Sequence, residues 1–240
     1  MKLGIMQPYF YPYLGYFDLI NYSDKWVVFD TVQYIRHGWM NRNRIVNPNG
    51  GWQYIIAPLK KHSRNTLIKD IEVMDDPGWH SRILGQIQHY RKAPYFTEVY
   101  RLMEECLEIR ESSLSRLNVA ILCNVCRYLD ISFKYEFYSE MDLKIGQIEG
   151  PADWALRISE AMGAGEYVNP PGARNMFDEA KFQELGMKLT IRELPVFVYE
   201  CGGFEFVPGL SIIDVLMWNS PEQIKNYLDF HEVESNAVEI

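Results

Sequence analysis

The chain has 240 residues, a formal net charge of −8 at pH 7, and 48% hydrophobic against 23% charged residues. A chain of this length and composition can bury a substantial core, which excludes intrinsic disorder. Its negative charge excludes a general nucleic-acid-binding protein, because contacts with phosphates need a basic surface. A local basic cluster can still bind a small molecule that carries a phosphate.

No apolar stretch approaches the length of a membrane span. Lys2 is followed at once by strand and turn residues, not by the long apolar region of a signal peptide. We therefore expect a cytoplasmic protein without a membrane span and without a nucleic-acid partner, and no pattern indicates its oligomeric state.

The four cysteines predict core residues and no metal site. Cys123 and Cys126 form a C-x-x-C pattern, but they lie in a largely apolar stretch with helical spacing. Neither a second cysteine pair nor a nearby histidine completes a zinc site.

The first 44 residues are the most informative part of the chain. An apolar run at 3–6 predicts a buried strand, followed by a loop and by a helix that starts near Gly15. A second apolar run at 26–29 ends at Asp30. Polar residues at two strand ends, next to a helix start, are typical of the mouth of an α/β sheet, where ligands bind.

The remaining elements predict a mixed α/β fold. Helices are expected at about 79–91, 99–109, 114–129, 152–162 and 178–185, with two short helices after Gly209. Strands are expected at 52–57, 68–74, 133–141, 188–194 and 196–200. The Asn49-Gly50 pair suits a hairpin turn. We predict a single α/β domain over residues 1–240, with a mainly parallel Rossmann-like sheet and a helical segment at about 79–129.

Two runs of cations follow predicted strands and suggest binding of a phosphate or carboxylate. Arg42 and Arg44 would share one face of a strand, with Asn41 and Asn43 on the other. Arginine binds such groups in a bidentate manner. Lys60 ends the next strand in the same way. The alternative is an ordinary solvated loop.

Three residues are candidates for catalysis. His37 and His62 lie in polar loops and have an intrinsic pKa suited to a general base, although each can be an ordinary surface residue. Asp30 could orient a base, a ribose hydroxyl or a metal ion, or could simply cap a turn.

Three further residues are candidates for substrate binding. Gln7 follows a buried strand and needs a partner, either a ligand or the loop backbone. Tyr13 belongs to a dense aromatic loop that serves as an apolar plug, a stacking wall for a sugar or base, or both. Asn219 lies near the end of a predicted helix, whose start Ser211 is expected to cap.

Several motifs resemble one known family. The stretches QPYFYPYLGYFDLI, VVFDTVQY, Asn41–Ile45 and PGLSIIDVLMWNS, in this order, are similar to the WbqC-like family, and the resemblance covers nearly the whole chain. It implies a role in the biosynthesis of bacterial O-antigen (lipopolysaccharide) or another surface polysaccharide, with aminoacyl transfer, notably of glycine to an amino sugar, as the proposed reaction. Arg36 and His37 stand where a serine and a lysine are expected, which leaves no lysine role there.

These patterns lead to one main hypothesis and two rivals. The main one is a transferase that moves an aminoacyl (glycyl) or other acyl group to an amino sugar or sugar nucleotide, with ATP and Mg²⁺ as one possible means of activation. A nucleotidylyl or other nucleotide-dependent transferase is the first rival, because Tyr13–Tyr16 is placed like the H-x-G-H motif of nucleotidylyltransferases, although tyrosines replace both histidines. The second rival is a non-catalytic sugar-nucleotide-binding protein. Under the main hypothesis, one pocket should bring together Gln7, Asp30, Asn41, Arg42 and Arg44.

Overall fold

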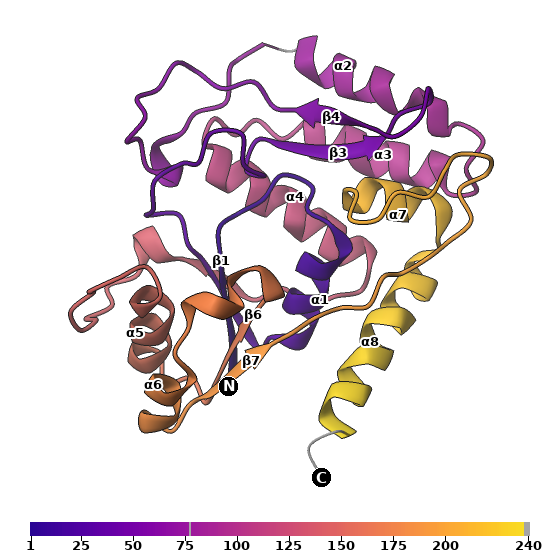
Figure 1. Ribbon diagram of the computed structural model, residues 1–240. Coiled ribbons are helices and arrows are strands. Elements are labelled where there is room, and N and C mark those ends of the chain that lie inside the picture. The colour runs from indigo at the N-terminus through magenta and orange to yellow at the C-terminus, as the bar shows by residue number, and fades with distance from the viewer. Residues whose placement is uncertain (77, 238–240) are drawn as a thin grey trace. The chain divides into compact units, whose positions relative to one another are not determined.

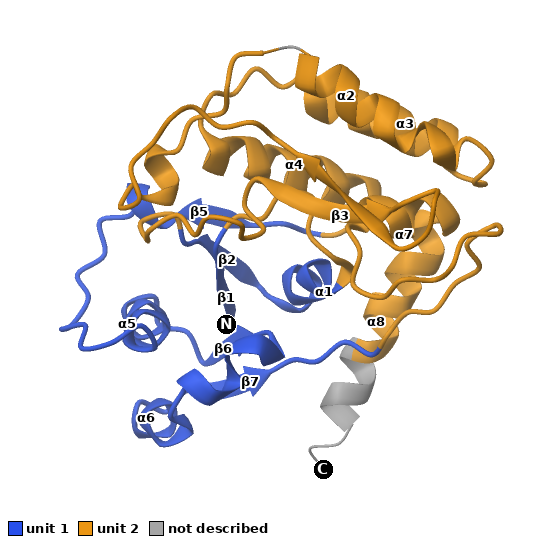
Figure 2. Cartoon of the chain, turned by 45° about the horizontal axis from the view of Figure 1, so that its top comes forward, with its two compact units in different colours: residues 1–7, 15–29, 132–195 blue, residues 8–14, 30–131, 196–240 orange. Residues whose placement is uncertain are grey.

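The computed structural model describes residues 1–76 and 78–237, with side chains in the last helix up to His231 (Figure 1). The chain forms two compact units, each built from segments that are distant in sequence (Figure 2). Unit 1 comprises residues 1–7, 15–29 and 132–195, and unit 2 comprises residues 8–14, 30–131 and 196–240. The single domain expected from the sequence stays a prediction.

Unit 1 contains a five-stranded sheet in which all neighbouring strands are parallel. Its strands are β1 (Lys2–Met6), β2 (Lys25–Val28), β5 (Tyr135–Phe137), β6 (Glu166–Asn169) and β7 (Lys188–Ile191). Their order in the sheet is β5-β2-β1-β6-β7. Numbered along the chain within this sheet, the order is 3-2-1-4-5, which is the order of the doubly wound Rossmann fold. The predicted α/β class with a mainly parallel sheet is confirmed.

Helices cover both faces of this sheet (Figure 2). The helical elements of the unit are α1 (Leu14–Tyr22), η3 (Tyr138–Glu140), α5 (Asp153–Ala161), η4 (Pro171–Met176) and α6 (Glu179–Glu184), where η denotes a 3₁₀ helix. Leu3 and Ile5 point to one face and form a core with α5 and α6. Trp26 points to the other face, where its ring centroid lies 5.2 Å from that of Tyr16 in α1.

Unit 2 combines a β-hairpin with helices. The hairpin is antiparallel, pairs Arg44 with Tyr54, and consists of β3 (Arg42–Val46) and β4 (Trp52–Ile56). The helical elements are η1 (Ile68–Asp70), α2 (Gly78–Gln86), η2 (Ile87–Tyr90), α3 (Phe96–Leu107), α4 (Leu114–Tyr128), α7 (Ile212–Trp218) and α8 (Pro221–Ala237). In the turn, Gly50 and Gly51 have φ of 108° and 67°, a region that glycine enters without a steric penalty. The hairpin turn predicted from Asn49-Gly50 is confirmed.

Two predicted strands are wrong. Residues 68–74 form η1 and two isolated bridges instead of a strand, because the buried residues Ile68 and Ile71 are three positions apart and not two. Residues 196–200 alternate like a strand but pair with no neighbour, and Val198 is 69% exposed. The strands expected at 133–141 and 188–194 are present but shorter.

The helix caps read from the sequence are confirmed. The Asp178 carboxylate accepts a hydrogen bond from Ala180 N at 3.1 Å. Ser220 and Gln223 form a reciprocal pair at the start of α8, with bonds of 2.9 and 3.1 Å. No helix in residues 1–76 and 78–237 is both long and apolar enough to cross a bilayer.

Candidate functional site

An aromatic loop at 8–14 is fixed to the hairpin and to α7 within unit 2. The buried Asn43 side chain donates hydrogen bonds to the carbonyl oxygens of Phe10 (3.1 Å) and Tyr11 (2.8 Å). Ser211 Oγ donates to the same Tyr11 carbonyl at 2.8 Å while accepting from Ile213 N as a helix cap. Tyr11 adopts φ of 41°, which a non-glycine residue holds only where its surroundings impose it. The expected capping role of Ser211 is confirmed.

Asn118 of α4 fixes the same loop from another side. This fully buried amide donates to the carbonyl oxygens of Pro8 (2.9 Å) and Met40 (2.7 Å). Buried amides that saturate backbone carbonyls make a loop rigid, because each bond costs free energy to break without replacement. Residues 8–14 therefore form a rigid support for the hairpin.

One side of the hairpin carries cations stacked on aromatic rings, and we call it the cation–aromatic face, comprising Trp39, Arg42, Arg44, Trp52 and Tyr54. The Arg42 guanidinium lies 4.2 Å from the Tyr54 ring centroid, and the Arg44 guanidinium lies 5.2 Å from both tryptophan rings. The Nε atoms of both arginines are buried without a hydrogen-bond partner. The face thus offers two immobilised cations with unused donors.

The aromatic members of this face were not identified from the sequence. A signal was available, because Trp52 and Tyr54 alternate along the strand that the Asn49-Gly50 turn pairs with Arg42 and Arg44. Trp39 and Trp52 remain 36% and 41% exposed, so a ligand can reach their rings.

His62 is held in one orientation and tautomer. Its Nδ1 lies 2.9 Å from the carbonyl oxygen of Lys60, which can only accept, so Nδ1 carries the proton and Nε2 the lone pair. That Nε2 is buried without a hydrogen-bond partner. Nε2 is therefore the ring nitrogen without a partner, and a ligand reaches it only if the surrounding atoms move.

Tyr34 connects His62 with the hairpin. Its ring lies edge-on to the imidazole at 5.2 Å, and its hydroxyl donates to Asn41 Oδ1 at 2.7 Å. Burial raises the pKa of Tyr34, an effect that the nearby charges of Arg42 and Arg36 partly offset. Tyr34 thus contacts both His62 and Asn41.

His37 and Asp30 differ in accessibility. His37 is exposed with φ of 63°, and its carbonyl oxygen accepts a hydrogen bond from the Arg42 guanidinium. Asp30 is only 2% exposed, and its carbonyl oxygen accepts from Lys69 N at 2.9 Å. His37 thus helps to fix Arg42 through its backbone, and its side chain is open to solvent.

The remaining predicted residues make contacts that stabilise the structure. The Lys60 ammonium is 2.5 Å from Glu72, which raises the pKa of Lys60. Asn219 is buried and donates to Val215 O at 2.8 Å, so its amide serves the end of α7. Tyr13 makes an isolated backbone bridge with Ser211.

Gln7 lies at the carboxyl end of β1 in unit 1, where its carbonyl accepts from Tyr16 Oη at 2.9 Å. Asp30, Asn41, Arg42 and Arg44 all lie in unit 2. Their convergence with Gln7 stays a prediction.

A buried hydrogen-bond network around Asp214 was not predicted from the sequence. The Asp214 carboxylate accepts from the hydroxyls of Tyr90 and, at 2.6 Å, Tyr199, and Tyr90 in turn accepts from Val46 N of β3 at 3.0 Å. Burial raises the pKa of Asp214, and the two hydroxyls partly counter it. The network ties the hairpin to α7. Within the described ranges, no group of three or more His, Cys, Asp or Glu side chains could hold a metal ion.

Comparisons with known proteins place the chain in one family. The model of the WbqC-like protein family matches residues 7–226. The chain is also 32% identical over 237 residues to the "Uncharacterized protein Rv1507c" of Mycobacterium tuberculosis (strain ATCC 25618 / H37Rv), covering 95% of this chain and 98% of the relative. No solved structure is significantly similar to it. The motifs, the family match and the full-length relative agree: the chain belongs to the WbqC-like protein family.

Proposed function

We propose that the protein is a transferase that moves an aminoacyl or other acyl group to the amine of an amino sugar or sugar nucleotide, in the synthesis of a surface polysaccharide. The observation that carries the proposal is the pairing of a cation–aromatic face with a fixed histidine base in the same unit. Such a pairing provides both a place for a phosphate-bearing ligand and a group that accepts a proton.

The cation–aromatic face suits a ligand with a phosphate and a flat ring. Arg42 and Arg44 are partly exposed, so their guanidinium groups can approach a phosphate oxygen through the terminal nitrogens, although the Nε atoms are sealed from solvent. Charge-assisted bonds of this kind are about twice as strong as neutral ones. The exposed rings of Trp39 and Trp52 stack on a base or a sugar. A sugar nucleotide combines these two features.

His62 is the proposed general base. An ammonium group must lose a proton before its nitrogen attacks the acyl carbon, and we assign that proton to Nε2 once movement of the surrounding atoms exposes it. A nitrogen–carbon bond then forms, the bond between the acyl carbon and its leaving group breaks with its electron pair on the leaving group, and the second proton of the nitrogen passes to that leaving group or to water. Asn41 and Tyr34 hold the base in place, while Asp30 and His37 remain proposed participants, as an orienting carboxylate and a second base.

ATP with Mg²⁺ is one way to activate the carboxyl group of the donor. Two partly exposed guanidinium groups suit the charge of a triphosphate, so Arg42 and Arg44 are the residues that would hold it. When bound, ATP supplies the activation that turns a free carboxylate into an acyl donor.

A second candidate is a nucleotide-dependent transferase without amide chemistry. The strand order of unit 1 favours it, because doubly wound sheets of this order bind nucleotides at the carboxyl ends of their strands. In unit 1 the switch in strand order falls between β1, which Gln7 follows, and β6.

The test is incubation of the protein with a nucleotide-linked amino sugar, glycine and ATP, followed by mass spectrometry of the sugar. We expect the glycyl mass increment, and a loss of at least roughly a hundredfold in rate for His62→Gln with sugar-nucleotide binding retained. His231→Gln, a histidine of α8, is the matched control and should react like the wild type.

Two other outcomes would contradict the proposed acyl transfer. Release of pyrophosphate without any amine acceptor supports the second candidate. Binding of the sugar nucleotide without turnover, across several activated donors and amino sugars, contradicts both and leaves a non-catalytic binding protein.

A further inference from the structure

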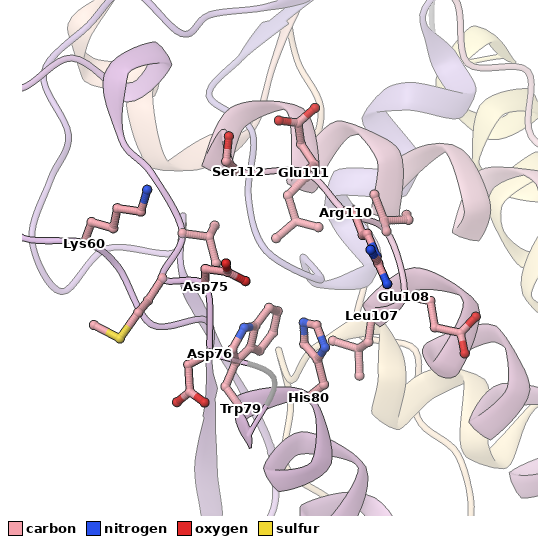
Figure 3. A pocket seen from close by; sticks show the side chains of 14 residues that line it. Lys60, Asp75, Asp76, Trp79, His80, Leu107, Glu108, Arg110, Glu111 and Ser112 are labelled. Carbon is pink, nitrogen blue, oxygen red and sulfur yellow. The ribbon is translucent and has the colours of Figure 1, made fainter.

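A cavity of about 1000 Å³ lies in unit 2, with Lys60 and Trp79 among the residues that line it (Figure 3). Its walls are the segment 73–76, the first turn of α2 and the connection from α3 to α4. Lys60 is its sole member among the residues singled out from the sequence. The cavity therefore needs its own explanation.

The lining of the cavity is predominantly acidic. It contains the four carboxylates of Asp75, Asp76, Glu108 and Glu111 and the two cations of Lys60 and Arg110. Lys60 is already neutralised by Glu72 at 2.5 Å. Negative charge therefore dominates, which favours a cationic ligand.

Two of the four carboxylates accept hydrogen bonds from backbone N–H groups, and the other two do not. Asp76 accepts from Gly78 N and Glu111 from Ser113 N, each at 2.9 Å. Asp75 and Glu108 cap no backbone group in the described part of the chain, and Figure 3 shows them on opposite sides of Trp79. These two carboxylates are available as counter-charges.

Trp79 provides the second, independent sign of a ligand. The residue is only 3% exposed, and it lines the cavity. Within the described residues, the Nε1 of Trp79 donates no hydrogen bond. It is not sealed from solvent, whereas the Nε1 atoms of Trp26 and Trp218 are. A buried indole that faces a cavity with a free donor calls for an acceptor in the cavity.

The other walls define the body of the ligand. Leu107 and Leu117 contribute apolar surface to the lining of the cavity. Burial lowers the pKa of His80, so this neighbour adds no positive charge at neutral pH to repel an ammonium group.

We propose that this cavity is a binding site for a small primary ammonium compound that carries hydroxyl groups, such as an amino alcohol or an amino sugar. The ammonium group is neutralised by Asp75 or Glu108 and lies against the indole of Trp79. A hydroxyl oxygen accepts the free Nε1–H of the same side chain. The inference stands independently of the proposed transfer reaction, because it concerns binding alone.

The test compares two sugars that differ at one group. Glucosamine carries an ammonium group at slightly acidic pH, and N-acetylglucosamine has the same ring without the charge. We expect glucosamine to bind the full-length protein and to shift the Trp79 indole N–H resonance, assigned with Trp79→Phe, while N-acetylglucosamine binds at least about tenfold more weakly.

Matched variants separate the cavity from general electrostatics. The Asp75→Asn/Glu108→Gln double variant should lose roughly tenfold in affinity for glucosamine. Glu98→Gln/Glu105→Gln changes the net charge equally, on exposed positions of α3 outside the cavity lining, and should bind like the wild type. Equal binding of the two sugars by the wild type overturns the proposal, as does equal loss of affinity in the two double variants.

Discussion

At the scale of single residues, the polar side chains of the hairpin divide into two groups with opposite tasks. Arg42 and Arg44 point to the cation–aromatic face, whereas Asn43 between them is 4% exposed and points inward. The alternation follows from the two-residue period of a strand. The same run of donors therefore supplies both a candidate binding surface and its internal support.

The first prediction concerns the support. Asn43→Ala removes the donor to Phe10 O and one of the two donors to Tyr11 O, which keeps its bond from Ser211 Oγ, so the free energy of unfolding should fall by about 1–3 kcal/mol. Urea unfolding measures it, and the exposed Asn65→Ala should change it little. An unchanged midpoint for Asn43→Ala would show that the loop is held by other contacts.

The sequence predicted those parts of the candidate site that follow from local periodicity, and it did not predict the others. The shared face of Arg42 and Arg44 follows from strand alternation. The approach of His62 to Tyr34 and Asn41 does not, because it depends on the path of the loop after β4. The bonds of Asp214 do not follow from periodicity either, because they join it to Tyr90 and Tyr199, which lie 124 and 15 residues away.

At the scale of elements, unit 1 is stabilised by a buried ion pair between α1 and the segment after β7. Arg192 Nε and one terminal nitrogen lie 2.6 and 2.7 Å from the two carboxylate oxygens of Asp18. The side chains are 5% and 1% exposed. A bidentate pair is specific in geometry, so it fixes how the helix lies relative to the edge strand.

The second prediction concerns this pair. Asp18→Asn leaves the buried guanidinium without its counter-charge and should lower the free energy of unfolding by about 3–5 kcal/mol. Asp18→Leu/Arg192→Met removes both charges and should lose less than Asp18→Asn, since neither partner then remains unpaired. Thermal and urea unfolding compare the variants; a larger loss in the double variant would refute the argument from an uncompensated charge.

Element types were predicted best where a long periodic segment decided them. The helices of the segment 79–129 and the two strands of the opening motif appear where the sequence placed them. The alternating segment 196–200 did not become a strand, because strand formation needs a neighbour to pair with, and sequence alternation contains no information on one. Its Phe197 packs on Tyr227 of α8 instead, with ring centroids 4.4 Å apart.

At the scale of the whole molecule, the chain passes repeatedly between its two units. Residues 30–131 leave the parallel sheet after β2, build the hairpin and the helices, and return for β5. The Rossmann order of the sheet is therefore made of strands separated by a long insertion. A group whose pKa differs between the folded and unfolded states contributes to the free energy of unfolding wherever it lies, so its pH dependence can be measured on the full-length chain.

The third prediction uses such a group. Burial lowers the pKa of His89 below its ordinary value of 6.5, against a smaller opposite effect of its bond to Gln86 O. The unfolded chain therefore binds a proton at higher pH than the folded chain does. The stability from this group is fully present above pH 6.5 and is lost as the pH falls through 6.5 toward the lower folded value.

His89→Asn tests this at the level of the whole chain. Asparagine can still donate to Gln86 O but does not titrate, so its free energy of unfolding should decline less than that of the wild type as the pH falls below 6.5. The exposed Gln88→Asn should follow the wild type.

Asp214 has a raised pKa and acts with the opposite sign, because its buried carboxylate costs stability as the pH rises through that value. Because the charge of His89 also lowers the pKa of Asp214, the comparison is repeated with and without His89→Asn in an Asp214→Asn background. Identical slopes with and without His89→Asn would show that His89 is protonated as readily in the folded chain as in the unfolded one.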